Sequence, residues 1–375
     1  MNMNKINTDR LIKTFQKIVS IDSTSFEERD IADFLLRQYH ALGIKLSEDS
    51  SAQQTGGNCG NLHGMLEGTV DMPPLLFCAH MDTVEPSKNK QAIIHENGKI
   101  TSDGTTVLGS DDAAALAVIL EAVQVLQEKS IAHRPIELLF TTAEEPYCEG
   151  ISHMDFSVLR AREAYVFDLS GAVGHAALQA PTILSFCVKF SGKSAHAGFA
   201  PEDGIHTIQA AVKALSEISN GRIGDTTVNV GTIHGGIQNN IVPDECTFTG
   251  EIRSYVDEHA QQQLEHIKSV SRRAAEQIGA SVEVTYKRHV TAYCTPETAS
   301  VVSRFRNACE TLGLPCELQS TFGGSDNNYL ALHGISGIVP ATAMNQVHSC
   351  QEYTTITELE NAAKLALQLM CDTEV

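Results

Sequence analysis

The acidic and histidine side chains that could do chemistry gather in a few short motifs of the sequence. These are His80 with Asp82, Asp111 with Asp112, Glu144 with Glu145, and the single residues Asp168 and His348. Crowded carboxylates repel one another until some take up protons, and divalent cations remove that conflict. Imidazole and carboxylate are the usual ligands of a hydrolytic zinc ion, which takes about four. His348, in a polar turn after an apolar segment, completes a set large enough for two metal ions.

Two metal ions about 3.5–4 Å apart could share a bridging carboxylate and a bridging water molecule. The ions would lower the pKa of that water and polarise a substrate carbonyl group. A nearby carboxylate that binds no metal would take the proton from the water and deliver it to a leaving amine. The chemistry predicted is hydrolysis of an amide bond. Asp82, two residues after His80, could accept the second ring N–H of His80 and fix its tautomer.

Most of these motifs follow a strand-like segment. Leu75–Ala79, Ile136–Thr141 and Ala164–Phe167 are apolar runs of strand length, and 113–127 has a helical pattern. Strands that alternate with helices predict an α/β layer with a largely buried sheet. Ligands bind beyond the carboxyl ends of such strands, so the motifs point to one crevice. Each motif alone has a simpler explanation, as a cap, a solvated turn or a structural histidine, but their recurrence at the same strand end favours the metal site.

The first two helices have start signals in the sequence. Asn7 or Thr8 could cap a helix with an apolar face. Ser25 followed by Glu28 predicts a capping box for a second helix, which Gly43 would end.

The pattern of elements changes near Pro181. The expected order is strand, helix, two strands, helix and strand, which is that of a ferredoxin-like fold, over 182–191, 204–218, 226–233, 246–253, 257–278 and 281–288. Helical patterns follow at 300–312 and 356–369. We therefore predict a catalytic domain formed by residues 1–181 and 294–375, with a small α+β domain inserted at 182–293.

Composition excludes several classes of protein. The 375 residues include 27 Lys and Arg against 46 Asp and Glu, a formal charge of −19, which argues against nucleic acid or an anionic membrane as partner. No apolar run approaches the roughly 18–20 residues that cross a bilayer, and the first residues lack the apolar core of a signal peptide. The ten cysteines form no CxxC pair, which suits reduced thiols. We expect a cytoplasmic protein.

The motifs together resemble the dizinc exopeptidase family that includes peptidase T, carboxypeptidase G, succinyl-diaminopimelate desuccinylase and aminoacylase. They lie in the family's order between about residues 8 and 370, at 79–84, 109–114, 141–145, 167–168, 194–198, 240–244, 251–254, 322–328 and 347–348. The resemblance implies a zinc-peptidase-like α/β/α catalytic domain with a ferredoxin-like lid domain. One departure is Ala113, where many relatives carry Lys.

The resemblance also implies a role for each site residue. His80 and Asp168 would bind one zinc ion, Glu145 and His348 the other, and Asp111 would bridge them. Glu144 would be the general base, and Asp82 would orient His80. The Asp111–Asp112 peptide bond is often cis in the family.

Four residues in or near the lid domain are expected to contact substrate. His196 would donate a hydrogen bond to the oxyanion of the tetrahedral intermediate. Asn240, Arg253 and Gly324 would hold the substrate, with Arg253 suited to a carboxylate by its two-pronged guanidinium. Alternatively, His196 is a surface residue, Arg253 is paired with Glu251 or Asp244, and the loop around Gly324 is a turn.

The segments 195–204 and 322–328 are most similar to the peptidase T branch, which implies an aminopeptidase acting on short peptides, tripeptides in particular. The alternatives are an N-acyl amino acid amidohydrolase on the same scaffold and a catalytically silent peptide-binding protein. A purely structural metal site fits poorly, because structural zinc favours Cys and His ligands. The expected cofactors are two divalent ions, zinc first, with cobalt or manganese as alternatives. A homodimer could form through the lid domain, with His196 serving its own or a partner's site.

Overall fold

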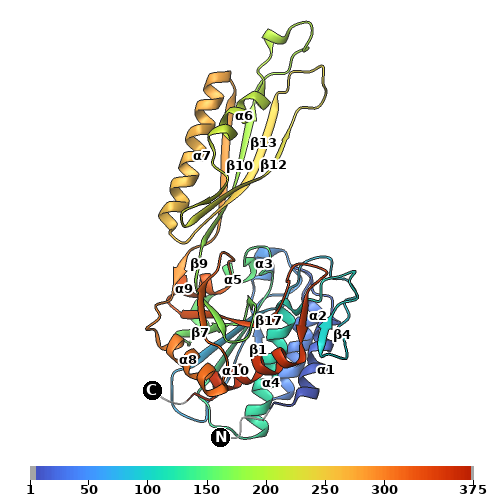
Figure 1. Ribbon diagram of the computed structural model, residues 1–375, viewed down its shortest axis with the longest axis vertical. Coiled ribbons are helices and arrows are strands. Elements are labelled where there is room, and N and C mark those ends of the chain that lie inside the picture. The colour runs from blue at the N-terminus through green and yellow to red at the C-terminus, as the bar shows by residue number, and fades with distance from the viewer. Residues whose placement is uncertain (1–5, 373–375) are drawn as a thin grey trace. The chain divides into compact units, whose positions relative to one another are not determined.

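The chain folds into two compact units, each with its own sheet (Figure 1). The computed structural model describes residues 6–372. One unit contains the chain up to Gln179, the segment Cys294–Thr321 and the chain from Ser325 onward, and the other contains Ala180–Tyr293 with Phe322–Gly324. The predicted domain boundaries place the short segment Phe322–Gly324 in the catalytic domain, but it groups with the inserted unit. It joins the inserted unit because the carbonyl oxygen of Phe322 accepts a hydrogen bond from Arg253 Nη1 at 2.8 Å.

A mixed ten-stranded sheet forms the centre of the first unit. Its main path runs, from edge to edge, through β1 (Leu46–Glu48), β2 (Leu62–Leu66), β6 (Ile136–Thr141), β3 (Leu75–His80), β7 (Glu163–Val166), β17 (Ser336–Met344), β9 (His175–Ala180) and β15 (Tyr293–Cys294). Off this path, β8 (Leu169–Ser170) pairs with β17 and β16 (Glu317–Ser320) with β9. A separate small sheet contains β18 (Tyr353–Thr355), β5 (Lys99–Thr101) and β4 (Ile93–Ile94).

The central strands β6, β3, β7 and β17 are parallel, so their carboxyl ends lie at one edge of the sheet. His80 pairs with Thr141 across β3 and β6. All residues of β3 and β6 are buried. This burial on both faces explains why the sequence of these strands is continuously apolar rather than alternating.

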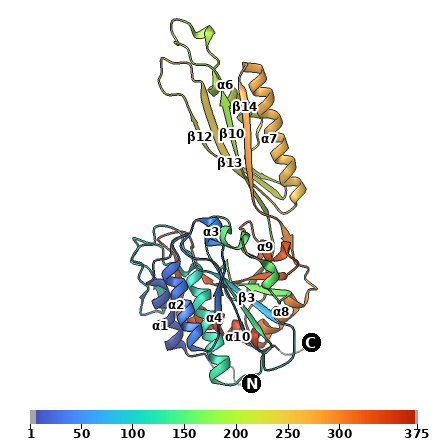
Figure 2. The same ribbon diagram turned by 180° about the vertical axis from the view of Figure 1, so that it is seen from behind.

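Helices cover the sheet of the first unit on both faces. They are α1 (Thr8–Val19), α2 (Arg29–Ala41), α3 (Ala52–Thr55), α4 (Ser110–Glu128), α5 (Glu149–Ser152), α8 (Ser300–Leu312), α9 (Asn327–Leu332) and α10 (Ile356–Met370), with a 3-10 turn at Phe156–Val158. Figure 2 shows α1, α2 and α4 side by side, and α4 also packs against α10. Phe77 belongs to the core beneath these helices, while its neighbour Cys78 points to the other face, toward Asp326 at the start of α9.

The predicted cap of the first helix is confirmed, whereas the predicted capping box of the second helix is wrong. The Asn7 side chain accepts a hydrogen bond from Arg10 N and caps α1. Helix α2 has no side-chain cap, because Ser25 Oγ donates instead to Asp82 Oδ2 at 2.7 Å. Glu28 Oε1 accepts from Phe26 N and from Ala143 N. The motif therefore stabilises a distant turn rather than its own helix.

The inserted unit has the order that the sequence predicts, with one additional short strand. The elements are β10 (Thr182–Ser191), a 3-10 turn (Pro201–Asp203), α6 (Thr207–Glu217), β11 (Gly221–Ile223), β12 (Thr226–Gly235), β13 (Glu245–Ser254), α7 (Asp257–Ile278) and β14 (Ser281–Val290). The sheet order β11-β12-β13-β10-β14 is antiparallel throughout. Helices α6 and α7 lie together on one face (Figures 1 and 2) and share with the sheet a core that includes Phe186, Phe248 and Leu264.

None of the helices within the described part of the chain has the length and apolar character needed to span a membrane.

Candidate active site

Two groups of histidine and carboxylate side chains meet at the carboxyl edge of the central strands. In the first, His80 Nε2 lies 3.0 Å from Asp111 Oδ1 and 3.8 Å from Asp168 Oδ1. In the second, His348 Nε2 lies 3.2 Å from Asp111 Oδ2 and 3.1 Å from Glu145 Oε2. Each group has the spacing to hold a metal ion. Asp111 belongs to both groups, with one oxygen facing each histidine.

Strand ends and turns bring these five residues together from distant parts of the sequence. His80 ends β3, Asp168 comes just after β7, and Glu145 follows β6. His348 lies in the loop between β17 and β18, and Asp111 lies in the first turn of α4. The peptide bond between Asp111 and the next residue is cis, as the resemblance implies.

The electrostatics of the site show an excess of buried negative charge. Burial raises the pKa of Glu144 well above its usual value, and the charge of Asp168 adds to the effect. Burial likewise raises the pKa of Asp168, with a further contribution from Asp111 that His80 opposes. Hydrogen bonds that His348 donates to the Asp111 and Glu145 carboxylates raise the pKa of His348 to about 10. The neighbouring carboxylates therefore favour the protonated, positively charged form of both His80 and His348.

The donor set fits a pair of divalent cations. Protonated histidines partly compensate the carboxylates when no cation is present, and metal ions would replace those protons with larger charges. Glu145 Oε1 is buried and makes no hydrogen bond, so an acceptor atom remains for a ligand. Three carboxylates and two imidazoles, with no thiolate, form the type of donor set found in catalytic rather than structural zinc sites.

Asp82 organises the site from behind. It is fully buried, and its Oδ1 lies 3.3 Å from His80 Nδ1, which places the carboxylate directly beside that ring. The same carboxylate also accepts hydrogen bonds from Glu144 N at 2.9 Å and Glu145 N at 3.2 Å. Asp82 thereby holds the proposed base and one proposed ligand, a second task that the sequence did not indicate.

Sequence reasoning missed four further side chains that contact this region. Cys148 Sγ donates to Glu144 Oε1 at 3.3 Å. Ser25 donates to Asp82, and Glu28 accepts from Ala143 N at 2.8 Å, beside the base. Glu352 accepts from the backbone around Asp111. Only the Ser25–Glu28 pair left a sequence signal, and it is identical to that of an ordinary helix cap.

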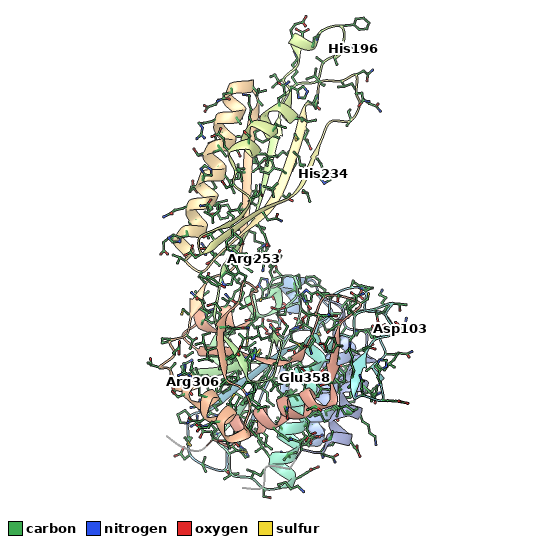
Figure 3. The ribbon with its side chains drawn as sticks, in the orientation of Figure 1. Asp103, His196, His234, Arg253, Arg306 and Glu358 are labelled. Carbon is green, nitrogen blue, oxygen red and sulfur yellow. The ribbon has the colours of Figure 1, made fainter. Side chains whose placement is uncertain are left out.

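The structure does not bring together all four predicted substrate residues. Figure 3 shows His196 and Arg253 at opposite ends of the inserted unit. His196 is exposed and lies near Asn240, whose carbonyl oxygen accepts from Ala197 N at 3.0 Å. Arg253 binds Glu251 through Nε at 2.7 Å and Nη2 at 3.1 Å, the alternative that the sequence left open. A Cβ atom added at Gly324 would lie 3.2 Å from Ile183 Cδ1 and from Val290 Cγ2, so tight packing is one reason for a small residue there.

Comparison with known proteins gives matches over both units. A model of peptidase family M28 matches residues 61–178, and a model of the peptidase dimerisation domain matches residues 180–278. The crystal structure of aminopeptidase PepT from Bacillus cereus is 34% identical, with a TM-score of 0.92, over 98% of this chain and 99% of that one. A tripeptidase from Staphylococcus aureus is 33% identical, with a TM-score of 0.95, over 98% of both chains. An uncharacterised Bacillus subtilis protein, YqjE, is 37% identical over 97% of this chain and 98% of its own.

Histidine and carboxylate clusters lie at the edge of the sheet, and the similarity to these peptidases extends over nearly the whole chain. The protein is therefore a peptidase, a class of hydrolase. The chain belongs to the peptidase T-like branch of the M20 metallopeptidases. The predictions of family, fold class and enzyme class are confirmed. The match to a dimerisation domain is consistent with the expected homodimer.

Proposed function

We propose that this protein is a zinc-dependent aminopeptidase that releases the N-terminal residue from short peptides, tripeptides in particular. The observation that carries this proposal is the 34% and 33% identity, over 98% of the chain, to an aminopeptidase and a tripeptidase. The two metal-binding groups that share Asp111 supply the chemistry such an enzyme needs. We assign catalysis to residues 1–181 and 294–375, and substrate contacts also to the inserted domain 182–293.

The residues proposed to hold metal are His80 and Asp168 for one ion, Glu145 and His348 for the other, and Asp111 for both. Zinc fits this ligand set best, and cobalt or manganese would also be accepted. When bound, the two ions would activate a water molecule and polarise the scissile carbonyl group.

Glu144 is the proposed general base. Its carboxyl group lies among the ligands but belongs to neither metal-binding group. Its backbone N–H donates to Asp82, which anchors the main chain, and Cys148 Sγ donates to its Oε1, which orients the side chain. Burial raises its pKa, which makes it a stronger base than an exposed glutamate. Glu144 would take the proton of the attacking water and deliver it to the departing amine.

His196 is the proposed hydrogen-bond donor to the oxyanion. Its Nδ1 lies 3.1 Å from Gly198 N and 3.2 Å from Phe199 N, and both backbone groups are donors. A ring nitrogen that accepts carries no proton, so in the neutral ring the proton is on Nε2. The turn therefore prepares the tautomer that this role requires. Asn240, Arg253 and Gly324 remain proposed substrate contacts, and Arg253 would have to exchange Glu251 for the substrate.

The substrate class is tested with the purified protein supplied with Zn²⁺ or Co²⁺. We expect cleavage of Ala-Ala-Ala and no cleavage of N-acetyl-alanine. The Glu144→Gln variant controls for contaminating peptidases. Cleavage of only the acetylated substrate would replace the aminopeptidase with a deacylase, and binding without turnover of either would indicate a silent peptide-binding protein.

A further inference from the structure

One buried carboxylate joins the two chain segments that carry Asp111 and His348. Glu352 is 1% exposed, and its Oε2 accepts from Gly109 N at 2.7 Å. Its Oε1 accepts from Ser110 Oγ at 2.7 Å and from Asp111 N at 3.0 Å. Glu352 lies four residues after His348 in sequence and 241 residues from Asp111. A single side chain therefore connects the residue shared by both metal-binding groups to the loop that supplies the second histidine.

The segment around Asp111 depends on this acceptor. Gly109 has a left-handed backbone, with φ of +71°, and a side chain there would meet Lys90 Cε at 3.0 Å. Asp111 and Asp112 have non-helical dihedral angles although they lie within α4. The first N–H groups of a helix have no partner within it, and this irregular turn is buried. Without Glu352, buried donors of this turn would lose their acceptor, which is unfavourable.

The loop that carries His348 is closed by its own hydrogen bonds. Asn345 and Tyr353 exchange two backbone hydrogen bonds, at 3.1 and 3.0 Å. Inside the loop, Glu352 N donates to Ser349 O at 3.0 Å. Glu352 is thus part of a closed loop, and its side chain transmits the position of that loop to the start of α4.

We propose that Glu352 is a positioning residue that sets the separation between Asp111 and His348, and thereby the affinity for the metal ion shared by Asp111, Glu145 and His348. The inference rests on the proposed function only for the assignment of two ions. Glu352 itself is not proposed to contact metal or substrate. Replacing it should change the metal affinity of the protein even in the absence of substrate.

The test is a zinc titration of the metal-free full-length protein in competition with a chromophoric chelator. Wild type should bind two ions. In Glu352→Gln, one oxygen becomes an N–H₂ group that faces a backbone or hydroxyl donor, so the three hydrogen bonds cannot all persist. We expect the affinity for one of the two ions to fall about 10- to 100-fold, the usual effect of losing a residue that orients a ligand.

Glu137 provides a matched control. It is also fully buried and accepts from Arg160 N and Ala161 N, but it lies near the opposite end of β6 from the ligands. Glu137→Gln should lower the free energy of unfolding and leave both zinc affinities unchanged. Ser110→Ala removes one donor to Glu352 and should weaken the same ion about two- to tenfold.

Wild-type affinity for both ions in folded Glu352→Gln would overturn the proposal. If that variant does not fold, wild-type affinity for both ions in Ser110→Ala would overturn the proposal instead. A fall in zinc affinity in Glu137→Gln equal to that in Glu352→Gln would also overturn it. A wild-type protein that binds no second ion would refute the proposal and the two-ion site together. Two ions bound without peptide cleavage would refute only the proposed function.

Discussion

The catalytic groups proposed for this enzyme lie in two regions that are built in opposite ways. Around Asp111, the backbone and side chains are buried and held by the carboxylates of Asp82 and Glu352. Around His196, the turn is exposed, and Phe199 beside it is 87% exposed. The first region is preorganised by the fold, whereas the second offers a donor on a surface turn. Changes to the ligands of the first region should therefore disturb metal binding, and changes in the second region should disturb turnover alone.

The largest effect is expected from Asp111→Asn, because Asp111 supplies an oxygen to each metal-binding group. Both ions should be lost or strongly weakened, and peptide hydrolysis should fall to background. Asp103→Asn changes an exposed acid of the same unit and should leave both properties unchanged (Figure 3). Metal analysis and a tripeptide assay measure the outcome. Full activity of Asp111→Asn would show that Asp111 is not a metal ligand required for catalysis.

Glu144→Gln should separate chemistry from metal binding within the buried region. We expect kcat to fall about 10²- to 10⁴-fold, the usual contribution of a general base, with two ions still bound. The measurements are steady-state kinetics and metal content. A kcat close to that of wild type would show that another group takes the proton.

His196→Ala should affect turnover without affecting the fold. Loss of one oxyanion donor typically costs about 10²- to 10³-fold in kcat. Because the ring is exposed, Tm and metal content should not change. His234→Ala, which removes another exposed histidine of the inserted unit, is the control. A lowered Tm would mean that the ring has a structural role, and an unchanged kcat would contradict its proposed role in catalysis.

The smallest effect is expected at Glu28, whose two donors share Oε1 while Oε2 is buried without a partner. Burial, with the charge of Asp82, raises the pKa of Glu28 from 4.5 to about 7. A raised folded-state pKa contributes stability that is present below about pH 4.5 and is lost as the pH rises through about 7. Glu28→Gln, which resembles the protonated acid, should therefore gain up to about 3 kcal/mol on wild type between pH 4.5 and 8.

Denaturant unfolding of the metal-free proteins at pH 5 and pH 8 measures this difference. The comparison with wild type cancels the other titrating carboxylates. A constant difference across this range would show that Glu28 is ionised throughout and that its site tolerates the charge.

The sequence predicted the elements more fully than the contacts between them. The bounds of β10, α7 and α8 agree with the predicted segments, because their apolar periodicity and flanking glycines are local properties. The five proposed ligands were found because each follows a strand or begins a helix. Glu352 and Cys148 were missed because their partners are defined by tertiary structure, and the acceptor role of Glu28 was hidden behind a helix-cap pattern. Likewise, the ion pair between Arg253 and Glu251 depends on side-chain conformations that the positions of these residues in the sequence do not determine.

The most direct test is a crystal structure of the zinc-loaded protein with anomalous diffraction recorded on both sides of the zinc absorption edge. We expect two anomalous peaks, one among His80, Asp111 and Asp168 and the other among Asp111, Glu145 and His348. Asp111 should bind both ions through its two oxygens. A single peak, or peaks away from these residues, would contradict the two-metal site on which the proposed function rests.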